Sequence, residues 1–260
     1  MKQLFNYHTH TSRCGHAFGS DEEYVLAAIK AGYKILGFSD HCPYRDFPNK
    51  RSHMDWEEFP EYVESINHLK EKYKDVIEIK LGIESEYYPE YVKEKEELRK
   101  DLDYFILGQH FLNPNGTGSF FKNIDDQTIM IYAKSVCEAM DTGMFEYVCH
   151  PDVFMCRQEE FTKACEEAAH MIAKKAVETN TPLEINVHGI RKGLRDFQNS
   201  KRYNYPFIEF WQIAAQYPVK VLIGIDAHAP EQLLSMEDIE TALLQVKGLD
   251  LDFISEPFIN

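Results

Sequence analysis

The sequence predicts an α/β protein whose parallel strands close into a barrel, and three observations lead to this fold class. Short apolar segments alternate with longer amphipathic ones along nearly the whole chain, at the spacing of strand–helix units. Roughly seven such units are present, which suits a closed barrel. Nearly every apolar segment is followed by a residue that can bind a metal. An open doubly wound sheet would instead gather its site at a single switch point.

The alternation begins at the start of the chain. Residues 4–8 form a short apolar strand, and the segment Ser20-Asp21-Glu22-Glu23 is typical of the start of a helix that ends at Gly32. The elements that we expect next are a strand at 34–39, an amphipathic helix at 56–74, a strand at 76–84, a highly charged helix at 92–100 and a strand at 104–107.

The second half of the chain continues in the same way. We expect a helix at 126–141, a short strand at 145–148, a long helix at 159–179, a strand at 182–187, a helix near 205–217 and a strand at 219–225. The long connections 42–55, 111–125 and 188–204 are predicted active-site loops, because loops of this length in a compact domain are usually functional. We expect a single domain over residues 1–260, since no linker or repeat divides the sequence.

Composition narrows the range of partners. The chain carries 43 acidic and 28 basic residues, a net charge of -15, which disfavours nucleic acid or an anionic membrane as a partner. No stretch approaches the roughly 18 apolar residues of a membrane span, and the first residues lack a signal-peptide pattern. We therefore expect a cytoplasmic protein with reduced cysteines, because its 6 cysteines form no CxxC pair.

Histidines dominate the residues expected at the barrel mouth. His8 and His10 alternate at the end of the first strand, so both imidazoles point to one face and can bind one ion together. His68 and His170 fall on predicted helices and are interpreted as solvent-facing. The histidines that end strands or begin the following loops are His8, His10, His16, His41, His110, His150 and His228. With Glu84 and Asp226 nearby in the same pattern, the set indicates a hydrolytic site with several metal ions.

These motifs, taken in order, resemble those of the PHP (polymerase and histidinol phosphatase) family. They are His8-x-His10-x5-His16, Ser39-Asp40-His41, Gly82-Ile83-Glu84, His110, His150-Pro151-Asp152 and Asp226-Ala227-His228. They cover nearly the whole chain. The segments His8-Thr-His10-Thr, Gly37-Phe38-Ser39-Asp40-His41, Glu184-Ile185-Asn186 and Gly189-Ile190-Arg191-Lys192-Gly193 are most similar to the histidinol-phosphate phosphatase branch. The resemblance implies a distorted (β/α)7, TIM-like barrel with its metal site at the carboxyl ends of the strands.

The resemblance also implies up to three divalent ions. Carried over motif by motif, the first ion takes His8, His10, Glu84 and Asp226. The second shares Glu84 as a bridge and adds His110 and His150, and the third takes His16, His41 and His228. Imidazoles and carboxylates without thiolates suit Zn, Fe or Mn and do not choose among them. Asp40 and Asp152 are expected to orient ligand imidazoles, with a structural cap as an equal alternative for Asp152.

Three divalent ions carry more positive charge than Glu84 and Asp226 can balance, so phosphate is the natural substrate group. We expect Glu84, Asp226 and His228 to take part in catalysis, with a metal-activated water attacking phosphorus. The resemblance further implies that Arg157 and Arg191 bind the phosphate; Arg195 is the alternate if the loop register slips, and Lys192 is a weaker candidate. Arg13 and Arg45 lie in loops beside ligands as weaker candidates.

His188 stands where the family pattern has a small residue. It is either a substrate contact, including a proton donor to the leaving group, or a buried loop histidine. Aromatic residues of the mouth loops either stack on a substrate imidazole or pack within the loops. In the first case Asp46 or Glu86 would meet the substrate amine.

The leading hypothesis is a metal-dependent phosphomonoesterase that hydrolyses L-histidinol phosphate in histidine biosynthesis. The alternatives are hydrolysis of another small phosphomonoester, hydrolysis of phosphodiesters or nucleic acid, and a non-catalytic metal-binding role. A nuclease role is disfavoured because the sequence has no basic track interleaved with aromatic residues.

Overall fold

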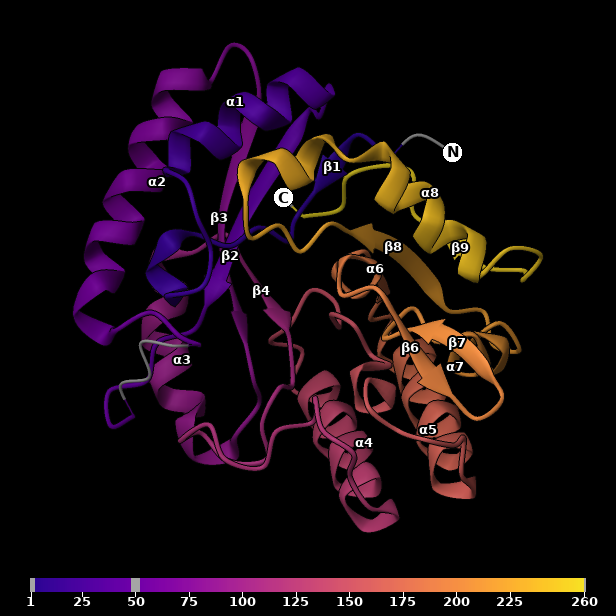
Figure 1. The fold of residues 1–260 in the computed structure, drawn as a ribbon. Coiled ribbons are helices and arrows are strands. Elements are labelled where there is room, and N and C mark those ends of the chain that lie inside the picture. Colours follow the sequence, from indigo (N-terminus) through magenta and orange to yellow (C-terminus); the bar gives the residue numbers. More distant parts are fainter. Residues whose placement is uncertain (1–2, 48–51, 260) are drawn as a thin grey trace.

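The computed structural model describes residues 3–47 and 52–259, and its strands lie around a common axis with helices on the outside (Figure 1). A parallel four-stranded sheet holds the first strands in chain order. These are β1 (Phe5–Asn6), β2 (Ile35–His41), β3 (Glu78–Ser85) and β4 (Tyr104–Leu107). A second parallel sheet has the order β5-β8-β9, with β5 at Leu183–Asn186, β8 at Lys220–Gly224 and β9 at Asp252–Phe253.

Two joints connect these sheets into a ring. Between β4 and β5, Val148 forms parallel bridges to Leu107 on one side and Leu183 on the other. The strand predicted at 145–148 is therefore reduced to one bridging residue. Between β8 and β1, Thr9 bridges Ala227 in parallel, and the amide of His10 donates to the carbonyl of Ala227 at 2.9 Å. The ring thus contains the expected strand units in chain order, and the distorted barrel is confirmed.

The joint between β8 and β1 is distorted because side chains replace part of its backbone ladder. The primary amide of Gln3 accepts from the Ile223 amide at 2.9 Å and donates to the Ile223 carbonyl at 2.7 Å. The side-chain oxygen of Asn6 accepts from the Ile225 amide at 2.9 Å. A primary amide carries the same donor and acceptor as a peptide group, so it satisfies strand edges that lie too far apart to pair directly.

Helices cover the outside of the ring (Figure 1). They are α1 (Asp21–Ala31), α2 (Phe59–Tyr73), α3 (Val92–Leu98), α4 (Asp126–Asp141), α5 (Lys163–Thr179), α7 (Ile208–Ala214) and α8 (Met236–Gln245). The predicted start of α1 is confirmed, because Ser20 and Glu23 form a reciprocal capping box. Gly32 ends that helix with a φ of 86°, a left-handed conformation that glycine adopts without strain.

Several predicted boundaries differ from the structure. Helix α5 begins at Lys163 and not near residue 159, because the Thr162 side chain accepts from the Cys165 amide and caps it there. The segment 188–204 is not an open loop. It contains the short helix α6 (His188–Arg191) and the antiparallel hairpin of β6 (Leu194–Phe197) and β7 (Ser200–Tyr203). Helix α8 and strand β9 were not predicted. Of the loop at 42–55, residues 48–51 lie outside the described part.

An aromatic cluster fills the barrel on the side away from the strand ends that carry the histidines. Phe5, Tyr7, Tyr104 and Tyr147 are fully or almost fully buried there, and the C-terminal Ile259 packs among them. A larger apolar layer lies between the strands and the helices.

All 6 cysteines are free and buried. No helix in the described residues is long and apolar enough to cross a membrane.

Candidate metal centre

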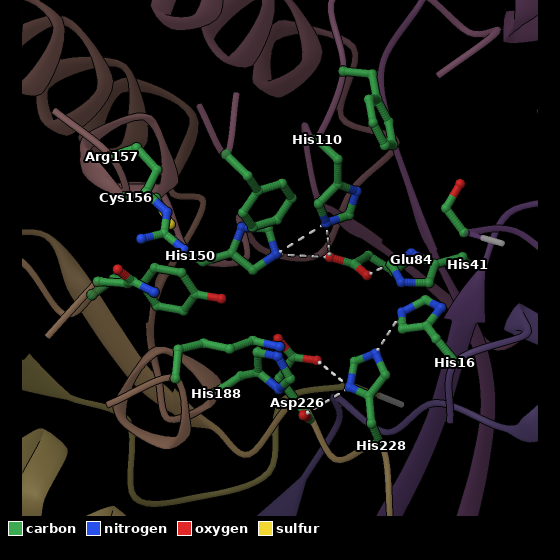
Figure 2. A pocket seen from close by; sticks show the side chains of 16 residues that line it. His16, His41, Glu84, His110, His150, Cys156, Arg157, His188, Asp226 and His228 are labelled. Atoms are coloured by element: carbon green, nitrogen blue, oxygen red, sulfur yellow. Dashed lines mark hydrogen bonds and ion pairs between the residues drawn. The ribbon is translucent and has the colours of Figure 1, made fainter. Parts of the chain in front are cut away.

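The predicted ligands lie together at the carboxyl ends of the barrel strands, where they surround and underlie a pocket of about 400 Å³ (Figure 2). His8 and His10 follow β1, His41 ends β2 and Glu84 lies near the end of β3. His110 follows β4, His150 follows the Val148 bridge, and Asp226 and His228 follow β8. His16 reaches the pocket from the loop after β1. Residues far apart in the sequence thus face one another because parallel strands all end at the same mouth.

The first predicted group has the geometry of one metal site. His10 Nε2 lies 3.1 Å from Asp226 Oδ1 and 3.5 Å from Glu84 Oε2. His8 Nε2 lies 3.5 Å from Glu84 Oε2 and 3.6 Å from Asp226 Oδ1. Ligand atoms of a tetrahedral ion with bonds of about 2.1 Å lie about 3.4 Å apart. These four atoms are buried and have no hydrogen-bond partner among the described residues, so the group fits one divalent ion.

The second predicted group faces the other oxygen of the same carboxylate. His150 Nε2 lies 3.0 Å and His110 Nε2 3.2 Å from Glu84 Oε1, and the two imidazole nitrogens are 3.3 Å apart. Figure 2 shows both rings pointing toward Glu84. Each of the two Glu84 oxygens therefore faces a different group of ligand atoms. A carboxylate that bridges two ions requires this arrangement.

The third predicted group is brought together less completely. His16 Nε2 and His228 Nε2 lie 3.0 Å apart, close enough to share an ion. The ring of His41 stacks on that of His16, but its Nδ1 lies 3.1 Å from Glu84 Oε2. The described polar contact of His41 is therefore directed to the bridging carboxylate and not to the His16–His228 pair.

The charges of this cluster suit metal ligation. Burial opposes ionisation of Glu84 and Asp226, but the surrounding histidines outweigh it and hold the pKa of both carboxyl groups well below the usual range. Burial and the nearby His10 lower the pKa of His41 and His228 well below the usual value. Without metal, both carboxylates are thus charged and His41 and His228 are neutral, the forms that bind cations. Burial also lowers the pKa of His8, His10 and His110, but the neighbouring carboxylates outweigh it and raise all three pKa values, so an ion must displace protons from this side of the cluster.

Buried carboxylates orient two of the ligand histidines from behind. Glu184 Oε2 lies 2.9 Å from His8 Nδ1, and Glu86 Oε1 lies 3.1 Å from His110 Nδ1. A carboxylate at Nδ1 fixes the ring and leaves Nε2 for the metal. Asp40 Oδ1 lies behind His10, but 3.5 Å from its Nδ1; the hydrogen bonds of Asp40 are accepted from the Thr11 hydroxyl and the His41 amide, so its orienting role stays a prediction. Glu86 is buried behind His110 and does not face the pocket as a partner for a substrate amine.

Sequence reasoning missed the role of Glu184, although a signal for it was present. Glu184 and Asn186 are two residues apart in β5, so both side chains point to the barrel interior. The amide of Asn186 donates to Glu184 Oε1 at 2.6 Å and to Asp226 Oδ2 at 3.1 Å, linking the orienting carboxylate to a predicted ligand. The sequence pattern that indicated an orienting role was a pair of polar residues two positions apart in an otherwise apolar strand.

Two glycines make room for these carboxylates. A Cβ on Gly108 would lie 1.9 Å from Glu84 Oε1, and one on Gly224 would lie 2.0 Å from Glu184 Oε2. Gly108 follows β4, the neighbour of the strand that carries Glu84, and Gly224 ends β8, the neighbour of the strand that carries Glu184. Any larger residue at either position would collide with a carboxylate, so the glycines belong to the construction of the site.

Two predicted ligands also have unusual backbone conformations. His150 has a φ of 29° and Asp226 a φ of 50°, in the left-handed region that residues with a Cβ rarely adopt. Such strain is retained where the surrounding structure requires a particular side-chain direction. Here it turns each side chain from its strand end toward Glu84 or His10.

The pocket wall opposite His16 and His41 carries cationic and neutral polar groups. Arg157 and Cys156 lie on this side in Figure 2. Lys192, Asn204 and Tyr205 also line the pocket. His188 lies beside the predicted ligand His228, with the two ring centres 4.9 Å apart. Burial lowers the pKa of His188 to about 3, so its imidazole is neutral at physiological pH and is a hydrogen-bonding group, not a protonated acid.

Arg191 is not among the residues that line this pocket, and its contact with phosphate stays a prediction. Its guanidinium donates to the Ile225 carbonyl at 3.0 and 2.6 Å, and its Nε lies 3.4 Å from Asp238 of α8. The next residue, Lys192, lines the pocket instead. The helical turn of α6 explains the difference, because adjacent residues on a helix point about 100° apart. The structure gives Arg191 a bracing contact with Ile225 and Asp238.

The other cationic candidates also have structural partners. The alternate Arg195 donates to the carbonyls of Met155 and Gln158 at 2.6 and 2.8 Å. Arg13 forms paired contacts with Asp21 and Glu61 and so anchors the loop that carries His16. Arg45 lies over the ring of Trp56. None of these three residues lines the pocket in the described part of the chain.

Of the two roles weighed for Asp152, the structural one has direct contacts. Its Oδ2 accepts from the Phe207 amide at 2.6 Å and from the indole of Trp211 at 3.1 Å. These bonds tie the loop after His150 to the start of α7. Burial raises the pKa of Asp152 to about 6, despite these hydrogen bonds.

Fold and site together define a barrel protein with imidazole and carboxylate groups arranged for divalent ions at one mouth. The sequence matches the model of the PHP domain over residues 6–188, and the chain belongs to this family. The enzymes of this family are metal-dependent.

Named relatives extend over most of the chain. A probable histidinol-phosphatase of Deinococcus radiodurans is 26% identical over 243 residues, covering 90% of this chain and 89% of that protein. A probable phosphatase of Clostridium acetobutylicum is 26% identical over 247 residues, covering 94% and 86%. The fold is similar to that of the histidinol phosphate phosphatase of Lactococcus lactis, solved with zinc, L-histidinol and phosphate. That match has a TM-score of 0.73, 17% identity, and covers 97% of this chain and 95% of the other.

Proposed function

We propose that this protein is a metal-dependent phosphomonoesterase that hydrolyses L-histidinol phosphate to L-histidinol and phosphate. The observation that carries the proposal is the position of Glu84, whose two oxygens face two separate groups of ligand atoms. The family match and the relatives named as histidinol-phosphatases support the same reaction and substrate. The protein is accordingly a hydrolase.

His8, His10, Glu84 and Asp226 would hold the first divalent ion, and Glu84, His110 and His150 the second. His16 and His228, with His41 beside them, would hold a third. Zn, Fe or Mn would suit these ligands. When bound, such ions supply positive charge for the phosphate oxygens and lower the pKa of water to near neutrality. Glu84, Asp226 and His228 act in catalysis by fixing those ions against the substrate.

Substrate phosphate binds between the ligand cluster and the opposite wall of the pocket. Arg157 supplies a guanidinium that matches two phosphate oxygens, and Lys192 adds a second positive charge. The neutral imidazole of His188, which also lines the pocket, donates or accepts one hydrogen bond. These three groups orient the phosphate so that water reaches phosphorus from the side of Glu84.

The experiment that tests the proposal measures phosphate release by protein of known metal content. L-histidinol phosphate is compared with other small phosphomonoesters and with single-stranded DNA at matched concentrations. The proposal expects a kcat/KM for L-histidinol phosphate at least about 100-fold above those of the other esters, the discrimination that a pocket with polar contacts to one substrate can supply. Equal turnover of many monoesters would overturn the substrate assignment. Cleavage of DNA without release of phosphate from any monoester would overturn the reaction class.

A further inference from the structure

A buried lysine lies behind the second group of ligands, on a helix that contributes no ligand. Lys95 of α3 is 1% exposed, and its Nζ lies 3.2 Å from the hydroxyl of Tyr44 and 4.4 Å from the centre of its ring. Burying an ammonium group is costly unless it is paired. The position of Lys95 therefore needs a partner of opposite charge.

That partner is reached through Tyr44. The Tyr44 hydroxyl donates to Glu86 Oε2 at 2.8 Å, and because Lys95 donates to the hydroxyl oxygen, the phenolic proton is directed to Glu86. One buried hydroxyl thus separates a buried ammonium from a buried carboxylate. The single hydroxyl of Tyr44 therefore couples the position of Lys95 to that of the Glu86 carboxylate.

Glu86 in turn holds two imidazoles with its other oxygen. Oε1 lies 3.1 Å from His110 Nδ1 and 3.2 Å from His53 Nε2. With its Nδ1 proton fixed on Glu86, His110 presents Nε2 to Glu84 Oε1 and His150 Nε2. A continuous series of contacts therefore runs from the α3 helix to the bridging carboxylate.

We propose that Lys95, acting through Tyr44 and Glu86, is a positioning residue that sets the orientation of His110 and hence the metal affinity of the second ion site. This inference rests on the proposed function only in taking His110, His150 and Glu84 as metal ligands. It assigns a role to a charged residue that touches neither ion nor substrate. Lys95 stabilises the ionised carboxylate, and the carboxylate fixes the imidazole.

The test uses full-length protein and Zn²⁺ as the probe. Zinc affinity is measured by competition with a chelator for the wild type, Lys95→Met, Glu86→Gln and the double variant. Lys93→Met is the control, since Lys93 lies on the same helix and is exposed. We expect Lys95→Met to weaken the second zinc site about tenfold and Glu86→Gln somewhat more, within the range seen for residues that orient ligands. The double variant should match Glu86→Gln alone, because both residues act through one series of contacts.

Kinetics, expressed per folded chain, provide a second readout to which a general loss of stability does not contribute. Lys95→Met should lower kcat about tenfold and leave KM within about twofold, since the phosphate-binding wall is untouched. Lys95→Arg should recover part of the zinc affinity. Tyr44→Phe keeps the ring and removes the hydroxyl, and it should reproduce the loss of zinc affinity. It provides the test if Lys95→Met does not fold.

Wild-type zinc affinity in folded Lys95→Met or Tyr44→Phe would overturn the inference, and so would additive losses in the double variant. Its failure is distinguishable from that of the proposed function. If L-histidinol phosphate is not the substrate, the zinc measurements still decide the role of Lys95. A wild-type protein that binds no zinc would overturn both.

Discussion

The two halves of the barrel position their functional groups differently. The N-terminal half, defined here as β1–β4 with the residues that directly follow each strand, has a continuous ladder in which β2 and β3 pair from Ile35↔Glu78 to His41↔Glu84. The C-terminal half, from Val148 to β8, has a shorter ladder from Leu183↔Val221 to Asn186↔Gly224, and single bridges at Val148 and Ala227 join it to the first half. The first half supplies most predicted ligands from strand ends, whereas the cations of the pocket, Arg157 and Lys192, come from a loop and a short helix end and are exposed.

This difference separates two physical requirements. Two ions that share Glu84 need ligand atoms held to within a few tenths of an ångström, and paired strands with buried carboxylates behind the imidazoles provide that rigidity. A phosphate is larger and carries diffuse charge, so long cationic side chains on loops can adjust to it. We infer that substitutions in the N-terminal half change metal content and that those in the pocket wall of the C-terminal half change substrate binding.

The largest effect should come from Glu84, on which both ion groups depend. Glu84→Gln removes the charge of the proposed bridge, and we expect kcat/KM to fall by about 10⁴ or more with loss of both ions. Metal content per chain, measured by mass spectrometry, and phosphate release check this. Glu78→Gln at the exposed start of the same strand is the control. Normal turnover in Glu84→Gln would refute the bridging assignment.

Metal affinity should depend steeply on pH. Burial opposes protonation of His8 and His10, but neighbouring carboxylates outweigh it, raising the pKa of His8 well above its usual value and that of His10 to about 9. His10 is therefore protonated at pH 7 without metal, and a first ion must displace at least this proton. The affinity for that ion should rise by at least about tenfold per pH unit, or about 100-fold, between pH 6 and 8. Zinc titrations across this range measure the affinity, and an affinity that does not change with pH would show that the imidazole is already unprotonated.

A smaller effect on substrate binding should separate Arg157 from Arg191. Arg157→Ala should raise KM about 30- to 100-fold with metal content unchanged, since it removes a charge-assisted contact with phosphate. Arg191→Ala should leave KM within about twofold and lower the free energy of unfolding by about 1–2 kcal/mol, because it breaks the bonds to Ile225. A large rise in KM for Arg191→Ala would show that Arg191 binds phosphate, as the sequence predicted, and would remove the difference between the two arginines.

The smallest effect tests whether an orienting carboxylate in the C-terminal half acts on metal binding. Glu184→Gln should weaken the first zinc site about tenfold, because a neutral amide fixes His8 Nδ1 less strongly. Chelator competition measures the change, with the exposed Glu178→Gln as control. An effect on KM with unchanged zinc affinity would place Glu184 with the substrate groups instead.

Much of the fold could be predicted because it depends on local patterns. The capping segment at Ser20 and the alternation of strands and helices are properties of neighbouring residues, and both have the expected structure. The strand predicted at 4–8 is shorter, at Phe5–Asn6 with a single further bridge at Thr9, but His8 and His10 still lie on one side, as their period of two predicts. The hairpin of β6 and β7 and the C-terminal α8 and β9 were missed. The hairpin has an exposed, polar pattern with little periodicity, so the sequence carries a weak signal for it.

The set of residues at the barrel mouth follows from the order of strands in the sequence, because parallel strands bring their carboxyl ends together whatever the details of packing. Which of these residues face the pocket depends on tertiary contacts. Lys192 lines the pocket, whereas its neighbour Arg191 contacts Ile225. Glu86 lies behind His110 and does not line the pocket. Side-chain direction there depends on contacts between residues distant in sequence, such as Arg191 with Ile225 or Tyr44 with Lys95, and no local pattern specifies those contacts.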